Sequence, residues 1–141
     1  QAADLHTPGF NQRVVHEVIR NGFLDQHVPT IRARYKAQRD AMAAALTEHL
    51  PEGSEWAAPE GGMFFWVRLP EGCHAMALLE QAVAAGVAYV PGEAFYAHAP
   101  DVRTMRLSFV TLSPDDIRTA VAALGRVLKR HLNEELEEVT P

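Results

Sequence analysis

The stretch RTMRLSFVTLSPDD (Arg103 to Asp116) contains an alternating strand pattern that runs into the start of a helix. In a strand, Met105, Leu107 and Phe109 would share one face and point toward a core. Arg106 would then lie on the other face, and burying a guanidinium is costly unless an anion pairs with it. The stretch therefore predicts either a solvated sheet face or a carboxylate that docks at Arg106.

The second half of this stretch carries the signals of a helix N-terminus. Ser113 is a typical N-cap, Pro114 suits the first helical position, and two acidic residues follow at the positive end of the helix dipole. The spacing of the apolar residues predicts a helix over 114–132. Its expected inner stripe consists of Ile117, Val121, Leu124, Leu128 and Leu132.

A strand, a helix and a second strand are expected upstream. GGMFFWVRL (61–69) is aromatic and β-branched between turn residues, which predicts a central strand buried on much of both faces. HAMALLEQAVAAG (74–86) predicts a helix that ends at Gly86, and VAYV (87–90) predicts the next strand. The residues of this helix expected to face the core are Met76, Leu79 and Val83.

Two further helices are expected nearer the start of the chain. One lies near 11–21, and a longer one lies near 30–50, where Pro29 can open the helix and Pro51 closes it. The inner side of the longer helix is expected to consist of Ile31, Tyr35, Met42, Leu46 and Leu50. The whole pattern predicts an α+β (α/β) fold in which helices cover a mixed sheet.

The composition is that of a globular protein, with 141 residues, 48% hydrophobic and 22% charged. A net charge of -5 without a basic cluster favours neither a nucleic-acid nor a membrane partner. Cys73 is the single cysteine, which fits a reducing compartment, so we expect a cytoplasmic protein. The seven histidines show none of the usual metal spacings, and we expect no metal site.

Two short segments hold candidate binding residues besides Arg106. Met63 and Phe64 follow a pair of glycines and offer adaptable apolar surface, although a strand start with core residues explains them as well. Phe95 follows the turn at Pro91 and could line a pocket or simply pack beside that turn. From pattern alone, a solvated strand face is favoured over a ligand site for Arg106.

The order of the motifs resembles a known family. ADLHT, NQ, the long helix, GGMFFW, VPGEAFY, MRLSF and SPDDI are together similar to the C-terminal part of fold-type I (class I/II) pyridoxal-phosphate aminotransferases. The kynurenine/2-aminoadipate (LysN-like) branch is the most similar, and the resemblance covers essentially the whole chain. It implies that residues 1–24 are the last helix of a large cofactor-binding domain and that residues 25–141 are the small C-terminal domain.

The resemblance also implies roles for the candidate residues. Arg106 would pair with the α-carboxylate that amino acids and 2-oxo acids share, and a planar guanidinium suits this partner. Met63 and Phe64 would approach the substrate side chain, and Phe95 would help to close the pocket. The segment from His6 to Gly9 would lie near the active site of the partner subunit in a homodimer.

The chain does not contain the lysine that would bond pyridoxal 5'-phosphate in this family. Transamination needs such a lysine, and neither Lys36 nor Lys129 resembles the lysine of the family. We therefore expect the chain to be a piece of a longer aminotransferase, with no catalytic or cofactor-binding residue of its own and no activity or bound cofactor when alone.

Other functions are compatible with the same residues. A carbon-sulfur lyase on this scaffold would keep the arginine, and a transcription regulator of the GntR/MocR type would use an aminotransferase-like domain as a ligand sensor. A stand-alone binding module is a third possibility. A lysine motif or a winged helix in the residues that precede Gln1 would separate the enzyme from the regulator.

Overall fold

The computed structural model describes the backbone of residues 7–139 and the side chains of residues 7–135. The chain forms two compact units, Gln1–Arg34 and Tyr35–Pro141, and the division falls inside one long helix. The assignment of residues 1–24 and 25–141 to two domains of a larger enzyme stays a prediction.

The first unit contains helix α1 (Gly9–Ile19) and the start of helix α2 (Phe23–His49). The expected helix near 11–21 is thus confirmed, and it begins slightly earlier. No residue of α1 is buried. Its exposed large apolar side chains are Phe10, Val14, Val15, Val18 and Ile19.

Helix α2 corrects one prediction, because Pro29 lies inside the helix and does not open it. Gly22 has a φ of 74°, which separates α2 from α1, and Asp25 stands favourably in the first turn of α2. Proline at 29 cannot donate to the carbonyl of Asp25, but the turns on either side continue. The expected inner side is confirmed in the second unit by the buried Met42 and Leu46.

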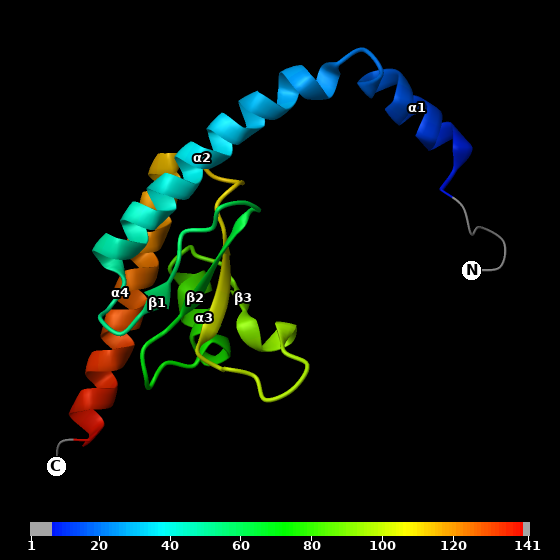
Figure 1. Ribbon diagram of the computed structural model, residues 1–141. Helices are drawn as coiled ribbons and strands as arrows, with labels where there is room; N and C mark the ends of the chain where they lie inside the picture. The colour runs from blue at the N-terminus through cyan, green and yellow to red at the C-terminus, as the bar shows by residue number, and fades with distance from the viewer. Residues whose placement is uncertain (1–6, 140–141) are drawn as a thin grey trace. The chain divides into compact units, whose positions relative to one another are not determined.

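The second unit contains a four-stranded sheet in the order β1-β2-β4-β3 (Figure 1). Its strands are β1 (Glu55–Trp56), β2 (Phe64–Arg68), β3 (Val90–Pro91) and β4 (Thr104–Ser108). All three neighbouring pairs are antiparallel, whereas a mixed sheet was expected. β2 and β3 both pair with β4, so the helix that connects them crosses over one strand. The short strand β1 was not predicted.

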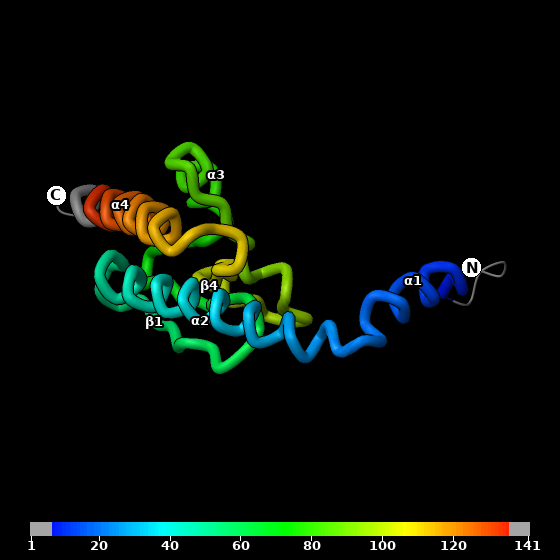
Figure 2. The backbone as a smooth tube through the Cα atoms, turned by 90° about the horizontal axis from the view of Figure 1, so that it is seen from above, coloured from blue at the N-terminus to red at the C-terminus, as the bar shows by residue number. Residues whose placement is uncertain are grey.

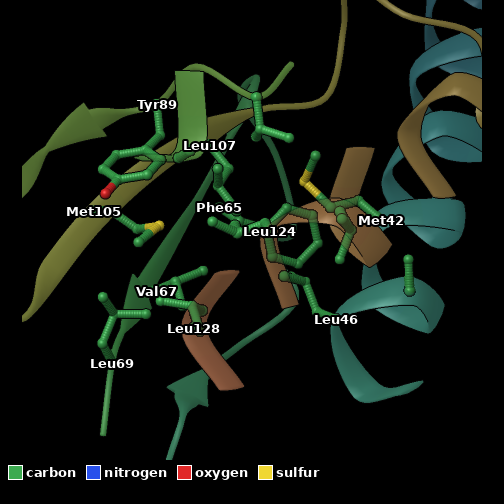
Figure 3. Packing of buried hydrophobic residues seen from close by; sticks show 14 of the residues in the cluster. Met42, Leu46, Phe65, Val67, Leu69, Tyr89, Met105, Leu107, Leu124 and Leu128 are labelled. Atoms are coloured by element: carbon green, nitrogen blue, oxygen red, sulfur yellow. The ribbon is translucent and has the colours of Figure 1, made fainter. Parts of the chain in front are cut away.

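One hydrophobic core joins the sheet to three helices (Figure 3). The sheet contributes Phe65 and Val67 from β2 and Met105 and Leu107 from β4, and each of these side chains is at most 5% exposed. The helices α2, α3 (Ala75–Ala84) and α4 (Pro114–Val139) contribute the rest of the core. All three helices therefore cover the same face of the sheet.

This arrangement explains two further differences from the predictions. β2 was expected to be buried on both faces, but Phe64 and Trp66 are 37% and 40% exposed because the helices cover only one face. β3 keeps only Val90 of the expected VAYV strand and adds Pro91. A proline lacks the N–H that a longer ladder requires, which suits the edge position of β3.

Helix α3 lies within the expected range 74–86 but turns a different side toward the core. Its buried residues are Ala75, Leu78 and Ala82. The predicted Met76 and Val83 are 49% and 54% exposed, while Leu79 is partly buried against the core. Two alanines let this helix approach the sheet closely. Gly86 follows with a φ of 83°, as expected for a helix C-terminus.

Helix α4 begins as predicted and continues beyond the predicted end at 132. The backbone N–H of Asp116 donates to Ser113 Oγ at 3.2 Å, and the predicted stripe faces the core. Figure 2 shows α4 beside α2. A Cβ atom at Gly125 would lie 3.0 Å from the carbonyl carbon of His49 at the end of α2, so only glycine fits without displacement. No helix within residues 7–139 is long and apolar enough to cross a membrane.

Candidate functional site

The candidate site lies on the face of the sheet that the three helices leave uncovered. Side chains alternate along β2 and β4, so the buried Phe65 and Met105 have neighbours that point the other way. Arg106 in β4 stands opposite Trp66 on one side and Val90 on the other. The register therefore places Arg106 in the middle of this uncovered face.

The short helix η1 (Gly92–Phe95) brings a further aromatic residue to Arg106. It follows β3 directly, and Gly92 is packed tightly against β4. A Cβ atom at Gly92 would lie 2.7 Å from Thr104 Cβ and 2.9 Å from the carbonyl oxygen of Thr104. Because glycine has no Cβ atom, η1 can begin close to the sheet and carry Phe95 to the uncovered face. No larger residue fits at position 92.

Two phenylalanine rings hold the guanidinium of Arg106. Its Cζ atom lies 4.1 Å from the ring centroid of Phe64 and 4.5 Å from that of Phe95. At such distances each cation–π contact contributes roughly 0.5–2 kcal/mol, depending on how far water is excluded. The Nε atom of Arg106 is buried without a hydrogen-bond partner among the described residues. The arginine is thus fixed by rings and has no carboxylate partner within residues 7–135.

Trp66 and Tyr96 extend this aromatic group. The ring of Trp66 meets that of Phe95 edge to face, with centroids 5.6 Å apart and an interplanar angle of 76°. Tyr96 follows Phe95 in the chain, and its ring centroid lies 6.2 Å from that of Trp66. These contacts link β2 to the segment that carries Phe95.

The structure brings together three of the four predicted binding residues. Phe64 and Phe95 both contact Arg106, and Met63 directly precedes β2 and is 43% exposed. Their part in substrate binding stays a prediction. The predicted loop at His6 begins outside the described residues.

Sequence reasoning missed Trp66, whereas the segment after the turn at Pro91 indicates two exposed aromatic residues, Phe95 and Tyr96. A signal for Trp66 was present, because residues 64 and 66 must share one face of a strand. It was overlooked because FFWV was interpreted as buried on both sides. Tyr96 follows η1, and no sequence period predicts the direction of a side chain in such a segment.

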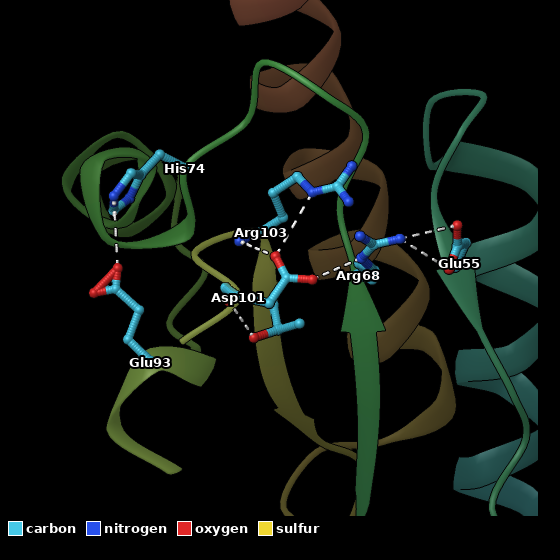
Figure 4. Close-up of polar contacts among 7 residues, drawn as sticks. Glu55, Arg68, His74, Glu93, Asp101 and Arg103 are labelled. Atoms are coloured by element: carbon cyan, nitrogen blue, oxygen red, sulfur yellow. Dashed lines mark hydrogen bonds and ion pairs between the residues drawn. The ribbon is translucent and has the colours of Figure 1, made fainter. Parts of the chain in front are cut away.

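A polar cluster at one end of the sheet shows a different use of arginine (Figure 4). Arg68 Nε donates to the carboxylate of Asp101 at 2.7 Å, and the backbone N–H of Arg103 donates to the same carboxylate at 3.1 Å. The hydrogen bond that Arg68 donates to Asp101 raises the pKa of Arg68 above its usual value. Glu55 lies 3.3 Å from Arg68 Nη1. Unlike Arg106, this arginine already has anionic partners.

The two lysines lie away from the uncovered face. Lys36 is on α2 and donates to Asp40 at 2.6 Å, and hydrogen bonds from Lys36 and Arg39 lower the pKa of Asp40. Lys129 is on α4. Both helices cover the face of the sheet opposite to Arg106. No group of three or more His, Cys, Asp or Glu residues that could hold a metal occurs in the described part of the chain.

Comparisons with known proteins give a consistent result. The family profile "Aminotransferase class I and II" matches residues 2–124. "Aromatic-amino-acid aminotransferase 1" of Thermococcus litoralis is 46% identical over 134 residues, which cover 95% of this chain and 32% of that protein. The multiple substrate aminotransferase of Thermococcus profundus superposes with a TM-score of 0.87 at 47% identity, covering 95% of this chain and 33% of its own.

Two other similar proteins bear on function. LysN, the alpha-aminoadipate aminotransferase of Thermus thermophilus, was solved with N-(5'-phosphopyridoxyl)-L-leucine; it superposes with a TM-score of 0.86 at 41% identity, covering 94% of this chain and 34% of its own. The HTH-type transcriptional regulator YdfD of Bacillus subtilis is 28% identical, over 89% of this chain and 26% of the regulator. This chain spans about a third of the length of the enzymes it matches.

Proposed function

The chain belongs to the class I and II aminotransferase family, and on this premise we propose that it is the C-terminal part of a pyridoxal-phosphate aminotransferase. The complete enzyme would move an amino group between an amino acid and a 2-oxo acid. In this proposal residues 1–24 belong to the large domain of that enzyme, and residues 25–141 form its small domain.

The observation that carries the proposal is the state of Arg106. Its guanidinium lies between two rings on an uncovered sheet face and pairs with no carboxylate among the described residues. A guanidinium offers parallel N–H groups that match both oxygens of a carboxylate. Amino acids and 2-oxo acids both carry an α-carboxylate, so one arginine can bind the donor and the acceptor in turn.

The described residues do not fit an aldehyde cofactor. Lys36 is paired with Asp40, and both lysines lie on helices that cover the opposite face of the sheet from Arg106. We propose that the lysine that bonds the cofactor belongs to residues that precede this chain. The part of this chain in the reaction is then to bind and orient the substrate carboxylate.

The surroundings of Arg106 favour substrates with sizeable apolar or aromatic side chains. Phe64 and Phe95 offer apolar ring faces, and Met63 adds a flexible apolar side chain at the start of β2. Such surfaces suit aromatic, branched-chain, kynurenine or 2-aminoadipate side chains, and they discriminate only weakly between substrates of similar size.

We propose that the complete enzyme works as a homodimer in the cytoplasm.

A ligand-sensing domain of a transcription regulator is the second candidate. The similarity to YdfD supports it, because a similar sequence occurs there in a protein named as an HTH-type transcriptional regulator. Arg106 would serve a sensor as well as an enzyme, since both bind a carboxylate. The higher identity to named aminotransferases favours the enzyme.

Substitution of Arg106 in the complete enzyme tests the proposal. Arg106→Ala removes two charge-assisted hydrogen bonds to the substrate carboxylate, so kcat/KM is expected to fall by roughly 10² to 10⁴. Arg106→Lys keeps the charge but loses the paired hydrogen bonds, so its kcat/KM is expected to lie between those of the unsubstituted enzyme and Arg106→Ala. The loss should affect amino donor and 2-oxo acceptor alike.

Arg68→Ala is the matched control, because it removes an arginine of the same sheet that already pairs with Asp101. Its kcat/KM should stay within a few-fold of the unchanged enzyme. Near-normal kcat/KM for a folded Arg106→Ala enzyme would contradict the proposal. Both half-reactions are measured by rapid mixing for each variant.

A further inference from the structure

The two rings that hold Arg106 are anchored very differently. Phe64 belongs to β2 and stands opposite Ser108 in a continuous ladder with β4. Phe95 ends the short helix η1 and is 49% exposed. A ring in such a position loses conformational freedom only if something else holds it. The ring of Phe95 therefore needs a support outside η1 if it is to stay over Arg106.

Trp66 is placed to give this support. It stands directly opposite Arg106 in the β2–β4 pairing, and its ring meets that of Phe95 edge to face at 5.6 Å. Edge-to-face aromatic pairs contribute about 0.5–1.5 kcal/mol beyond the area that they bury. The same indole ring lies 6.2 Å from the ring of Tyr96, which follows Phe95.

Packing of the core does not account for Trp66. Its neighbours Phe65 and Val67 are fully buried on the helix-covered face, whereas Trp66 is 40% exposed on the other face. Its two ring contacts lead to Phe95 and Tyr96, and Phe95 in turn contacts Arg106. The contacts of Trp66 thus form a chain that ends at the guanidinium.

We propose that Trp66 is a positioning residue, which holds Phe95 over Arg106 so that the guanidinium is ordered before a carboxylate arrives. The carboxylate in this statement rests on the proposed function, whereas the ordering of Phe95 and Arg106 does not. Pre-ordering strengthens binding because the bound geometry then costs less side-chain entropy. Trp66 acts on the guanidinium through its contact with Phe95.

The test uses proton–nitrogen NMR of arginine side chains in the 141-residue chain, with acetate as the carboxylate probe. Rings stacked on a guanidinium displace its Nε–H proton signal, so that signal reports whether Phe95 stays over Arg106. Trp66→Leu removes the aromatic edge, and Trp66→Phe retains one. Trp56→Phe is the matched control, because Trp56 instead meets the core residue Phe65 at 5.8 Å.

Trp66→Leu is expected to move the Arg106 Nε–H signal toward that of free arginine and to weaken acetate binding about 3- to 10-fold. Trp66→Phe should recover most of both properties. Trp56→Phe should leave the Arg106 signal and the acetate affinity unchanged, although its stability falls. This pattern separates positioning of the arginine from a general loss of stability.

An unchanged Arg106 signal and acetate affinity in folded Trp66→Leu would overturn the proposal. So would the absence of nuclear Overhauser contacts from Phe95 to both Trp66 and Arg106 in the unsubstituted chain, a measurement that needs no variant to fold. If Trp66→Leu releases the Arg106 signal but acetate binds to no form of the chain, the positioning role stands and the carboxylate role of Arg106 fails.

Discussion

The two faces of the sheet come from the same short strands and have opposite properties. On the helix-covered face, Phe65 and Met105 are 0% exposed and belong to the hydrophobic core. On the other face, Phe64 and Trp66 are more than a third exposed, and the ring of Phe64 contacts the guanidinium of Arg106. Aromatic residues in one strand thus alternate between the core and the proposed binding surface. Exposure distinguishes these roles, whereas residue type does not.

Replacing the two adjacent phenylalanines one at a time gives the largest expected difference between the faces. Phe65→Ala leaves a cavity among β2, β4 and the helices, which is expected to lower the free energy of unfolding by about 3–5 kcal/mol. Phe64→Ala removes a ring that is 37% exposed and should cost about 1 kcal/mol or less. Urea denaturation followed by circular dichroism measures both. Equal losses would show that the uncovered face carries as much stability as the core.

Alkaline pH should sharpen the comparison through Tyr89, which belongs to the core. Its hydroxyl donates to the carbonyl oxygen of Ala75 at 2.7 Å, and burial raises its pKa to about 12 from a usual value of 10.0. Tyr89 therefore ionises at a lower pH in the unfolded chain than in the folded chain. The contribution of neutral Tyr89 to the free energy of unfolding is complete below about pH 10 and is lost as the pH rises toward about 12. The loss amounts to about 2–3 kcal/mol.

Comparing unfolding of the unsubstituted chain with Tyr89→Phe over this pH range isolates the effect. Because Tyr89→Phe lacks the hydrogen bond to Ala75, its free energy of unfolding should be about 1 kcal/mol lower at neutral pH. Above about pH 10 its stability should fall less steeply than that of the unsubstituted chain. Tyr96→Phe, on the uncovered face, is the control for removing a phenol from an exposed site. Parallel pH curves for Tyr89→Phe and the unsubstituted chain would contradict the assignment.

The polar cluster at the end of the sheet should give the smallest effect. Asp101→Asn keeps the shape of the side chain but removes the charge that faces Arg68 and Arg103, and all three groups are partly solvated. The expected loss in unfolding free energy is about 0.2–1 kcal/mol, and it should shrink as salt is added. Thermal melts at low and high salt check this. A salt-independent loss above that range would mean that the cluster is held by more than exposed charge.

Sequence periodicity predicted the elements better than it predicted which sides of them are covered. In β4 the alternation of Met105 and Leu107 with polar residues left one solution, and the structure agrees. In α3 the alanines fit either side of the helix, so the larger Met76 and Val83 were assigned to the core in place of Ala75 and Ala82. Burial there depends on how closely the helix approaches the sheet, which is a tertiary property.

The site could be predicted in part for a similar reason. Arg106 stood out because a permanent charge interrupts an apolar strand, and Phe95 because it follows a tight turn. Trp66 did not stand out, since its importance lies in a contact with Phe95, which is distant in sequence. The two-residue strand β1 is shorter than any reliable period. Long-range contacts of this kind can be predicted only when the pairing of strands is known.

The tight fit of Gly92 against Thr104 separates positions that directed evolution can vary from one that it cannot. Any side chain at 92 would meet the Cβ and the carbonyl oxygen of Thr104 at less than 3.0 Å, so a library randomised there would consist mostly of damaged proteins. Ala94 and Phe95 are exposed, so neither position is closed to larger or smaller side chains in this way. In the proposed enzyme, a search for new substrate preferences would randomise 94 and 95 and keep glycine at 92.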